Sequence, residues 1–292
     1  MTPLRQRVIE DMTVRNFALT TQTTYVNQIS MFARHFDQSP EALGPEEIRR
    51  YQVYLAREKQ LAPSSIALAV AALRFLYNVT LQKHWALEEV LPMPKMPTTL
   101  PVVLSPEEVL QFLESIEHIQ HRTILTTCYA AGLRISEAVH LKPAHIDSPR
   151  MVIRVEQGKG AKDRYVMLSP RLLDTLRVWW RTKRPEHWLF PGRREGEPIT
   201  RHAVEKACQL AHDRCGIHKL ITPHSFRHAF AVHMLENGAD VRTIQLLMGH
   251  RSLSTTANYL RIARTKVCSA TSPLDLLPRP VDAKAFLPPQ QS

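Results

Sequence analysis

The chain has 292 residues, of which 44% are hydrophobic and 22% charged, a balance typical of soluble globular proteins. Its 38 Lys and Arg against 27 Asp and Glu give a net charge of +11, which favours a polyanionic partner such as nucleic acid. The length suits two domains, and 9 glycines against 21 prolines favour helices joined at prolines over a sandwich or barrel of tight hairpins.

The cysteines and the N-terminus bear on the cellular compartment. None of the four cysteines forms a C-x-x-C pair, and scattered cysteines in a chain of this size indicate a reduced, cytoplasmic protein. The first twelve residues carry charges and no apolar run, so no signal peptide is expected. No apolar stretch approaches the ~20 residues that a membrane helix needs, so we expect no membrane partner.

Residues 1–91 predict a small helical bundle, followed by a proline-rich linker over residues 92–104. Apolar side chains recur at helical spacing from Tyr25 to Phe36, and Pro45 and Pro63 each stand where a further helix begins. The side chains expected inside the last two helices are Ile48, Tyr51, Leu55, Ile66, Ala69, Val70, Leu73 and Leu76.

Residues 105–270 predict a second domain that is mostly helical with a small β-hairpin. Residues 151–155 and 164–168 read as two short strands, and a glycine-rich segment between them suits the turn. A tail rich in Pro and Gln follows over residues 271–292. Residues 96–292 hold 27 basic and 18 acidic side chains, so most of the positive charge lies in this part.

Four local patterns stand out in the second domain. They are Gly-Leu-Arg-Ile-Ser-Glu at 132–137, Gly-Lys-Gly-Ala-Lys-Asp-Arg at 158–164, His-Ser-Phe-Arg-His at 224–228, and Leu-Met-Gly-His at 247–250 followed nine residues later by Tyr259. His224 and Arg227 share one face of a helix, where an imidazole and a guanidinium suit an oxyanion such as phosphate. Each pattern alone is weak, but the four in this order are improbable by chance.

Together these patterns resemble the tyrosine recombinase (phage integrase) family, including the bacterial integrases and chromosome-dimer-resolving recombinases. The resemblance covers residues 105–265 through its motifs. It implies a helical core-type DNA-binding domain at 1–91 and a mixed, mostly helical recombinase catalytic domain at 105–270. The interval from Leu168 to His224 is compact, which favours a simple integrase or transposon-type recombinase over an integron integrase.

The resemblance also implies roles for single residues. Tyr259 attacks the scissile phosphate and forms a 3′-phosphotyrosyl link, while Arg134 and Arg227 clamp the phosphate oxygens. Lys159 protonates the leaving 5′-oxygen, and Glu137 orients its neighbours. Further implied roles are proton transfer for His224, a phosphate hydrogen bond for His250 and DNA binding for Lys162, Arg164 and Arg251.

No cofactor or metal is expected, because the phosphotyrosyl link conserves the bond energy and the chain has no phosphate-binding G-x-x-x-x-G-K-[ST] loop or clustered carboxylates. His118 and His121 form an H-x-x-H pair without an evident third ligand and are interpreted as surface histidines.

The expected partner is double-stranded DNA, with a monomer in solution and a homotetramer on paired sites. We expect a bacterial, nucleoid-associated protein that acts in integration, excision or transposition of a mobile element. Two other classes stay open, a type IB topoisomerase-like relaxing enzyme and a DNA-binding regulator without activity.

Overall fold

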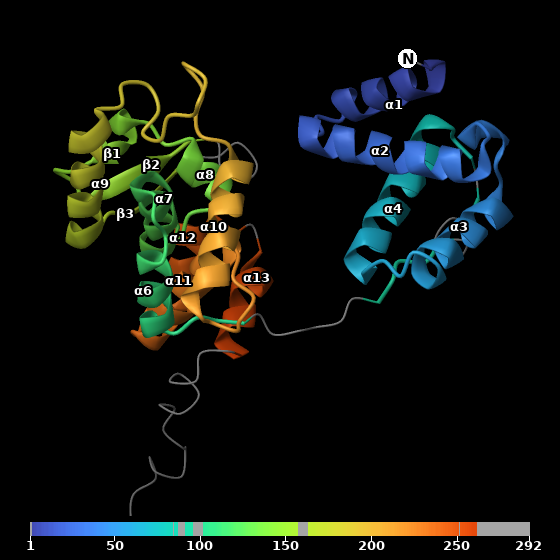
Figure 1. Ribbon diagram of the computed structural model, residues 1–292. Coiled ribbons are helices and arrows are strands. Elements are labelled where there is room, and N and C mark those ends of the chain that lie inside the picture. The colour runs from blue at the N-terminus through green and yellow to red at the C-terminus, as the bar shows by residue number, and fades with distance from the viewer. Residues whose placement is uncertain are drawn as a thin grey trace, which may run out of the picture. The chain divides into compact units, whose positions relative to one another are not determined.

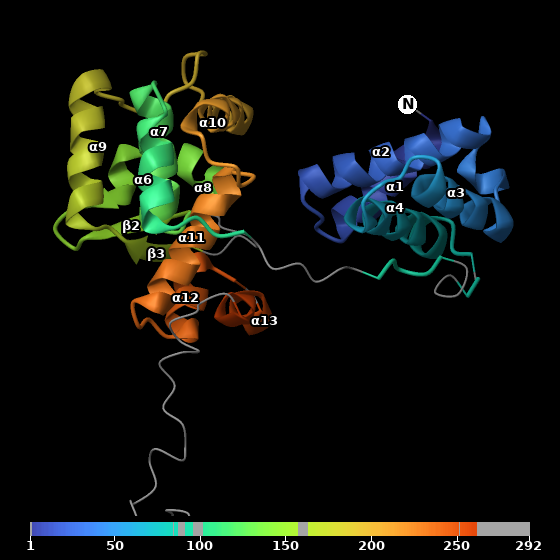
Figure 2. The same ribbon diagram turned by 60° about the horizontal axis from the view of Figure 1, so that its bottom comes forward.

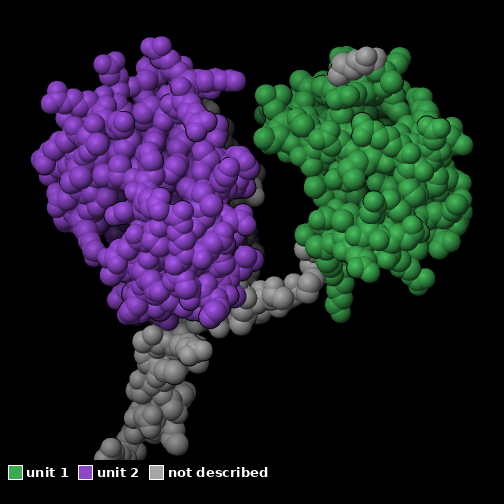
Figure 3. Space-filling view, viewed as in Figure 1, with its two compact units in different colours: residues 1–99 green, residues 100–292 purple. Residues whose placement is uncertain are grey.

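The computed structural model describes residues 2–83, 85–86, 91–95, 102–156, 163–250 and 252–261. The chain divides into two compact units, residues 1–99 and 100–292, and the division falls inside the proline-rich segment 92–104 (Figure 3). Both units are built mainly of helices, and one small sheet belongs to the second unit (Figure 1). The fold class that the sequence predicts is therefore confirmed. Among the described residues, no helix combines the length and apolar character that crossing a membrane requires.

Among its described residues, the first unit has four α-helices, which form a bundle. These are α1 (Pro3–Val14), α2 (Leu19–Phe36), α3 (Pro45–Arg57) and α4 (Pro63–Phe75), and α4 runs on into a π-helical turn, η2 (Leu76–Thr80). Proline stands at the start of α1, α3 and α4, where its missing N–H would have no helical partner anyway. Helix α1 is not distinguished by the sequence analysis.

The core of the first unit confirms the apolar pattern read from the sequence. All eight side chains expected inside α3, α4 and the start of η2 are buried. The ring of Phe32 on α2 meets the edge of Tyr51 on α3 at 5.1 Å between centroids. The hydroxyl of Tyr77 donates to the carbonyl of Pro40 at 2.8 Å, so the polar end of this buried ring is satisfied.

The second unit has eight α-helices among its described residues. They are α6 (Pro106–Glu114), α7 (Ile119–Ala130), α8 (Ile135–Val139), α9 (Pro170–Lys183), α10 (Arg201–Cys215), α11 (Pro223–Glu236), α12 (Val241–Met248) and α13 (Leu253–Ala257). Helix α6 begins with a reciprocal cap, because Glu108 N–H donates to Ser105 Oγ at 3.2 Å and Ser105 N–H donates to Glu108 Oε2 at 2.7 Å.

The sheet has three antiparallel strands rather than the two that the sequence predicts. Strands β2 (Val152–Val155) and β3 (Arg164–Met167) fall at the predicted positions, and β1 (Ile146–Asp147) is a further two-residue edge strand. The predicted turn between β2 and β3 lies outside the described residues. In the register, Ile153 opposes Val166, and both side chains face the core. The pairing brings the start of β3 towards the helices that carry the remaining motifs.

Helix α11 packs against α7, α10 and α12. Phe226 packs against Phe112 of α6 at 5.3 Å between ring centroids, and Ala229 and Ala231 are fully buried. Helices α11, α12 and α13 gather at one end of the unit (Figure 2). This arrangement holds the polar residues of α11 beside the segment that contains Tyr259.

Candidate active site

The path of the backbone just before Arg134 depends on Gly132. Gly132 has φ +63°, in the left-handed region, and a Cβ at this position would lie 2.5 Å from the ring of Phe230 on α11. The chain therefore passes close to α11 before Arg134 takes the N-cap position of α8. The sequence Gly132-Leu133-Arg134 thus places a guanidinium at the start of α8, a helix that packs against α7 and α10.

The carboxylate of Glu137 organises the site. Arg134 donates to it twice, from its backbone N–H at 2.9 Å and from its Nη1 at 2.8 Å. Arg164 of β3 adds a two-point contact, Nη1 to Oε1 at 3.0 Å and Nη2 to Oε2 at 2.8 Å. Burial by itself would raise the pKa of this carboxyl, which is 7% exposed, but Arg164 and Arg134 outweigh that effect and lower the pKa to about 2. Glu137 is therefore ionised at neutral pH.

Arg227 is the most deeply buried charge of the site, with 1% of its surface exposed. Its Nη1 donates to the carbonyl of Gly132, and its Nη2 donates to the carbonyl of Met248 at the end of α12. Glu137 lies 3.8 Å from Nη1 and supplies the opposite charge. Burial and the neighbouring Arg134 lower the pKa of Arg227 to about 10, so the guanidinium still carries its charge at neutral pH. The two hydrogen bonds fix the orientation of the Arg227 guanidinium plane.

The position of Arg164 differs from the sequence expectation of a DNA contact. Its side chain is 13% exposed and is turned inward, towards Glu137 and towards the carbonyl of Leu247, which accepts from Nε at 2.9 Å. Gly249 allows this approach, because a Cβ there would lie 3.1 Å from Arg164 Nη1. Arg164 therefore links β3 to α8 and to the end of α12. The difference follows from the fold, because β3 brings Arg164 within hydrogen-bonding distance of the buried Glu137 carboxylate.

His250 and Tyr259 lie close to each other beyond α12. The Nδ1 of His250 is 2.8 Å from Thr256 Oγ1, and the rings of His250 and Tyr259 are nearly parallel at 6.4 Å between centroids. Tyr259 is part of the short 3₁₀ helix η4 (Asn258–Arg261) and is 4% exposed. Burial raises its pKa, and Arg227 and Arg134 act in the opposite direction. The burial of His250, together with Arg227 and Arg134, lowers the pKa of that imidazole to about 4.

The sequence analysis assigns no role to His228, which the structure places against Tyr259. Its Nδ1 lies 2.7 Å from the Tyr259 hydroxyl. The ring of His224, one turn earlier on α11 and exposed, meets the ring of His228 edge to face at 4.4 Å. The sequence did contain a sign that His228 belongs to the site, because His224 and His228 are four residues apart and share a helix face.

The structure thus brings together seven of the residues that the sequence singles out, one of which is Arg164. The other six are Arg134, Glu137, His224, Arg227, His250 and Tyr259. Lys159, Lys162 and Arg251 lie outside the described residues, and so does the tail 271–292.

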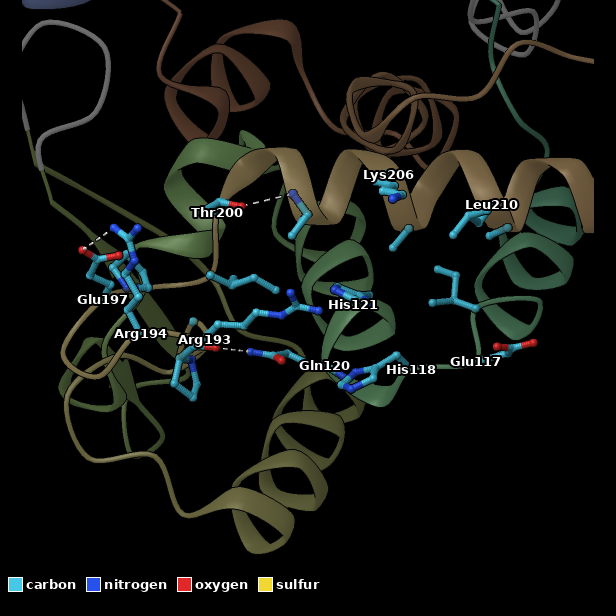
Figure 4. Close-up of a pocket in the computed structure, with 18 of the residues that line it drawn as sticks. Glu117, His118, Gln120, His121, Arg193, Arg194, Glu197, Thr200, Lys206 and Leu210 are labelled. Carbon is cyan, nitrogen blue, oxygen red and sulfur yellow. Dashed lines mark hydrogen bonds and ion pairs between the residues drawn. The ribbon is translucent and has the colours of Figure 1, made fainter.

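A separate cavity of about 930 Å³ lies between the start of α7, the segment 191–200 and α10 (Figure 4). His118 and His121 line it with their rings 4.9 Å apart. Among the described residues no third His, Cys, Asp or Glu joins them as a metal-binding group. Arg193 and Lys206 line the same cavity, which contains none of the residues around Tyr259.

Comparison with known families identifies the class of protein. The model described as "Phage integrase family" matches residues 102–266, and the model described as "Phage integrase, N-terminal SAM-like domain" matches residues 4–87. The chain belongs to the phage integrase family of tyrosine recombinases, and it is a site-specific recombinase enzyme.

Individual relatives agree with this assignment. The chain is 66% identical over 280 residues to a Sinorhizobium fredii protein named integrase/recombinase y4qK, an alignment that covers 96% of this chain and 91% of the relative. It is 37% identical over 243 residues to tyrosine recombinase XerA of Thermococcus onnurineus, covering 81% and 85% of the two chains. The fold resembles that of the Tn1549 transposon integrase in complex with transposon right end DNA, with a TM-score of 0.67 at 19% identity and coverage of 94% and 96%.

We predict that Glu137→Gln destabilises the second unit in a pH-dependent way. The folded pKa of about 2 lies below the ordinary 4.5, so the ionised carboxylate stabilises the fold fully above pH 4.5 and less as the pH falls towards 2. At pH 7 the variant should lose about 3 kcal/mol of unfolding free energy, and the difference from the wild type should shrink below pH 4. Urea denaturation at a series of pH values measures this.

The matched control is Glu46→Gln, which removes an exposed ion pair with Arg49 on α3. It should move the unfolding curve little at any pH. A constant gap between wild type and Glu137→Gln down to pH 3 would contradict the assigned charge state of Glu137.

Proposed function

We propose that this chain cleaves and rejoins DNA through a 3′-phosphotyrosyl link formed by Tyr259. The observation that carries the proposal is the position of Tyr259, a buried side chain within electrostatic reach of Arg134 and Arg227, two arginines that share one carboxylate. A phenol becomes a useful nucleophile only next to groups that take its proton and neutralise the phosphate it attacks. The proposed site has histidines for the first task and guanidinium groups for the second.

Arg134 and Arg227 clamp the non-bridging oxygens of the scissile phosphate in this proposal. Negative charge on these oxygens grows as the fifth bond to phosphorus forms, so fixed guanidinium groups bind the transition state better than the ground state. The buried contacts of Arg227 and the double contact of Arg134 with Glu137 support this role, because both side chains are held before DNA arrives. Glu137 and Arg164 act as positioning residues.

The remaining proposed roles concern protons and DNA. Lys159 protonates the leaving 5′-oxygen, His224 assists proton transfer at the tyrosine and His250 donates a hydrogen bond to the phosphate. Lys162 and Arg251 contribute to binding the DNA backbone. The sequence between residues 150 and 227 holds 17 basic and 8 acidic side chains, a charge excess that suits phosphate contacts.

We further propose that the substrate is double-stranded DNA carrying paired sites and that the reaction serves integration, excision or transposition. The transposon integrase with which the fold is shared is named as bound to transposon end DNA, which supports a mobile element as the setting. Two recombining duplexes need four strand cleavages. Since each chain offers one Tyr259, four copies on two sites are the natural stoichiometry.

Tyr259→Phe should abolish covalent capture of DNA while leaving DNA binding intact. The substitution removes only the attacking oxygen and keeps the ring that packs beside His250. A nicked suicide substrate should trap the wild type as a slow band in a denaturing gel and should trap none of the variant. A band of undiminished strength from the variant would rule out Tyr259 as the nucleophile.

Arg134→Lys and Arg227→Lys should slow cleavage by roughly a hundredfold to a thousandfold with little loss of DNA affinity. Lysine keeps the charge but cannot hold two oxygens in a planar fork, and the missing contact matters most in the transition state. Single-turnover cleavage and gel-shift titration separate the two effects. Arg177→Lys on α9, which alters an exposed charge, is the control and should match the wild type in both assays. Equal losses of affinity and rate would make these residues binding residues only.

On DNA with two cognate sites, the assembled complex should contain four copies of the chain, whereas free protein should be monomeric. Light scattering coupled to size exclusion gives both masses. A supercoil relaxation assay run beside a two-site recombination assay separates the proposal from a topoisomerase, because relaxation by a monomer without recombination would contradict it.

A further inference from the structure

The hydroxyl of Tyr259 has a specific partner that the roles above leave unused. His228 Nδ1 lies 2.7 Å from it, and the two rings stand 5.5 Å apart at 55°. Among the described residues, no hydrogen bond joins this hydroxyl to His224 or to His250. His228 is therefore the imidazole in direct contact with the oxygen that is proposed to react.

The backbone around His228 holds this contact rigidly. His228 sits in the middle of α11, between the buried residues Arg227 and Ala229. The ring of His224 packs edge to face against it on the side of the preceding turn. Tyr259 reaches it from η4, an element far along the chain, so the pair closes only when the second unit is folded.

Resting on the proposed function of Tyr259, we propose that His228 is a catalytic residue that accepts the phenolic proton when Tyr259 attacks the phosphate. In that step the Tyr259 O–H bond breaks and its proton moves to His228 Nδ1, while the phenolic oxygen bonds to phosphorus. The bond from phosphorus to the 5′-oxygen breaks, and that oxygen leaves with the electron pair and takes a proton from an acid, the proposed Lys159 ammonium or water. In rejoining, the proton on His228 returns to the phenolic oxygen.

The electrostatic surroundings suit an acceptor. Burial, with His224 and Arg227 as neighbours, lowers the pKa of His228 to about 4, so the imidazole is neutral at neutral pH and offers a lone pair. With Nε2 carrying the hydrogen, Nδ1 faces the phenol as an acceptor. A phosphate bound by Arg227 would offset part of the positive charge that lowers this pKa, making His228 more basic at the moment it is needed. The other charged or titratable side chains near His228 and Tyr259 are Arg134 and His250.

The decisive variant is His228→Asn, in which an amide replaces Nδ1 as a hydrogen-bonding group but cannot take a proton. With a nicked DNA substrate, its rate of covalent complex formation should fall by roughly a hundredfold or more while DNA affinity is kept. The matched control is His233→Asn on the same helix, because His233 Nδ1 makes a similar contact with Tyr129 at 2.9 Å, away from Tyr259. The control should react at the wild-type rate, and thermal unfolding verifies that both variants are folded.

A second substrate distinguishes proton removal from Tyr259 from proton donation to the leaving 5′-oxygen. A 5′-bridging phosphorothioate releases a thiolate that needs no proton, so it should rescue a variant of the leaving-group acid and leave the His228→Asn defect in place. Rescue of His228→Asn by this substrate, or a rate within about threefold of the wild type on normal DNA, would overturn the inference. The wild type and Tyr259→Phe run in parallel, because failure of the wild type to form any covalent complex would refute the proposed function instead.

Discussion

The site depends on one buried carboxylate. Glu137 lies within 4 Å of three guanidinium groups that come from α8, β3 and α11. Without that negative charge, the positive groups would repel one another in a region largely closed to water, where like charges interact strongly. The carboxylate therefore makes it possible to hold several arginines together in the absence of DNA. It also connects three elements that are far apart in the sequence.

This interaction explains which parts of the site sequence patterns predict. His224 and Arg227 share a helix turn, so local spacing was enough to pair them. Arg134 and Glu137 were singled out through the family resemblance. The contact of Arg164 with Glu137 spans 27 residues and depends on how β3 lies against α8. Its inward direction was not predictable, because an arginine beside a glycine-rich turn has the same local pattern whether it faces DNA or a buried acid.

The helices were predicted for similarly local reasons. Proline marks the start of α3 and α4, and the apolar positions that follow have the period of a helix, so both the element and its buried face could be read. Strand β1 has two residues and no alternating pattern of its own, and it exists only because β2 offers it an edge. His228 was present in the sequence motif but gained a role only when the fold brought η4 back to α11. The sequence patterns therefore lacked information about contacts between residues that are far apart in the chain.

Gly132 determines how far apart the two proposed phosphate-binding arginines stand. The segment leading to Arg134 rests directly on Phe230, and Phe230 is one turn after Arg227 on the same helix. The carbonyl of Gly132 also accepts a hydrogen bond from Arg227, so the same residue acts as a spacer and as an anchor. One additional methyl group at this position would push the segment before α8 away from Phe230 and alter the gap between the two guanidinium groups. The width of the proposed anion site therefore depends on the absence of a Cβ atom at residue 132.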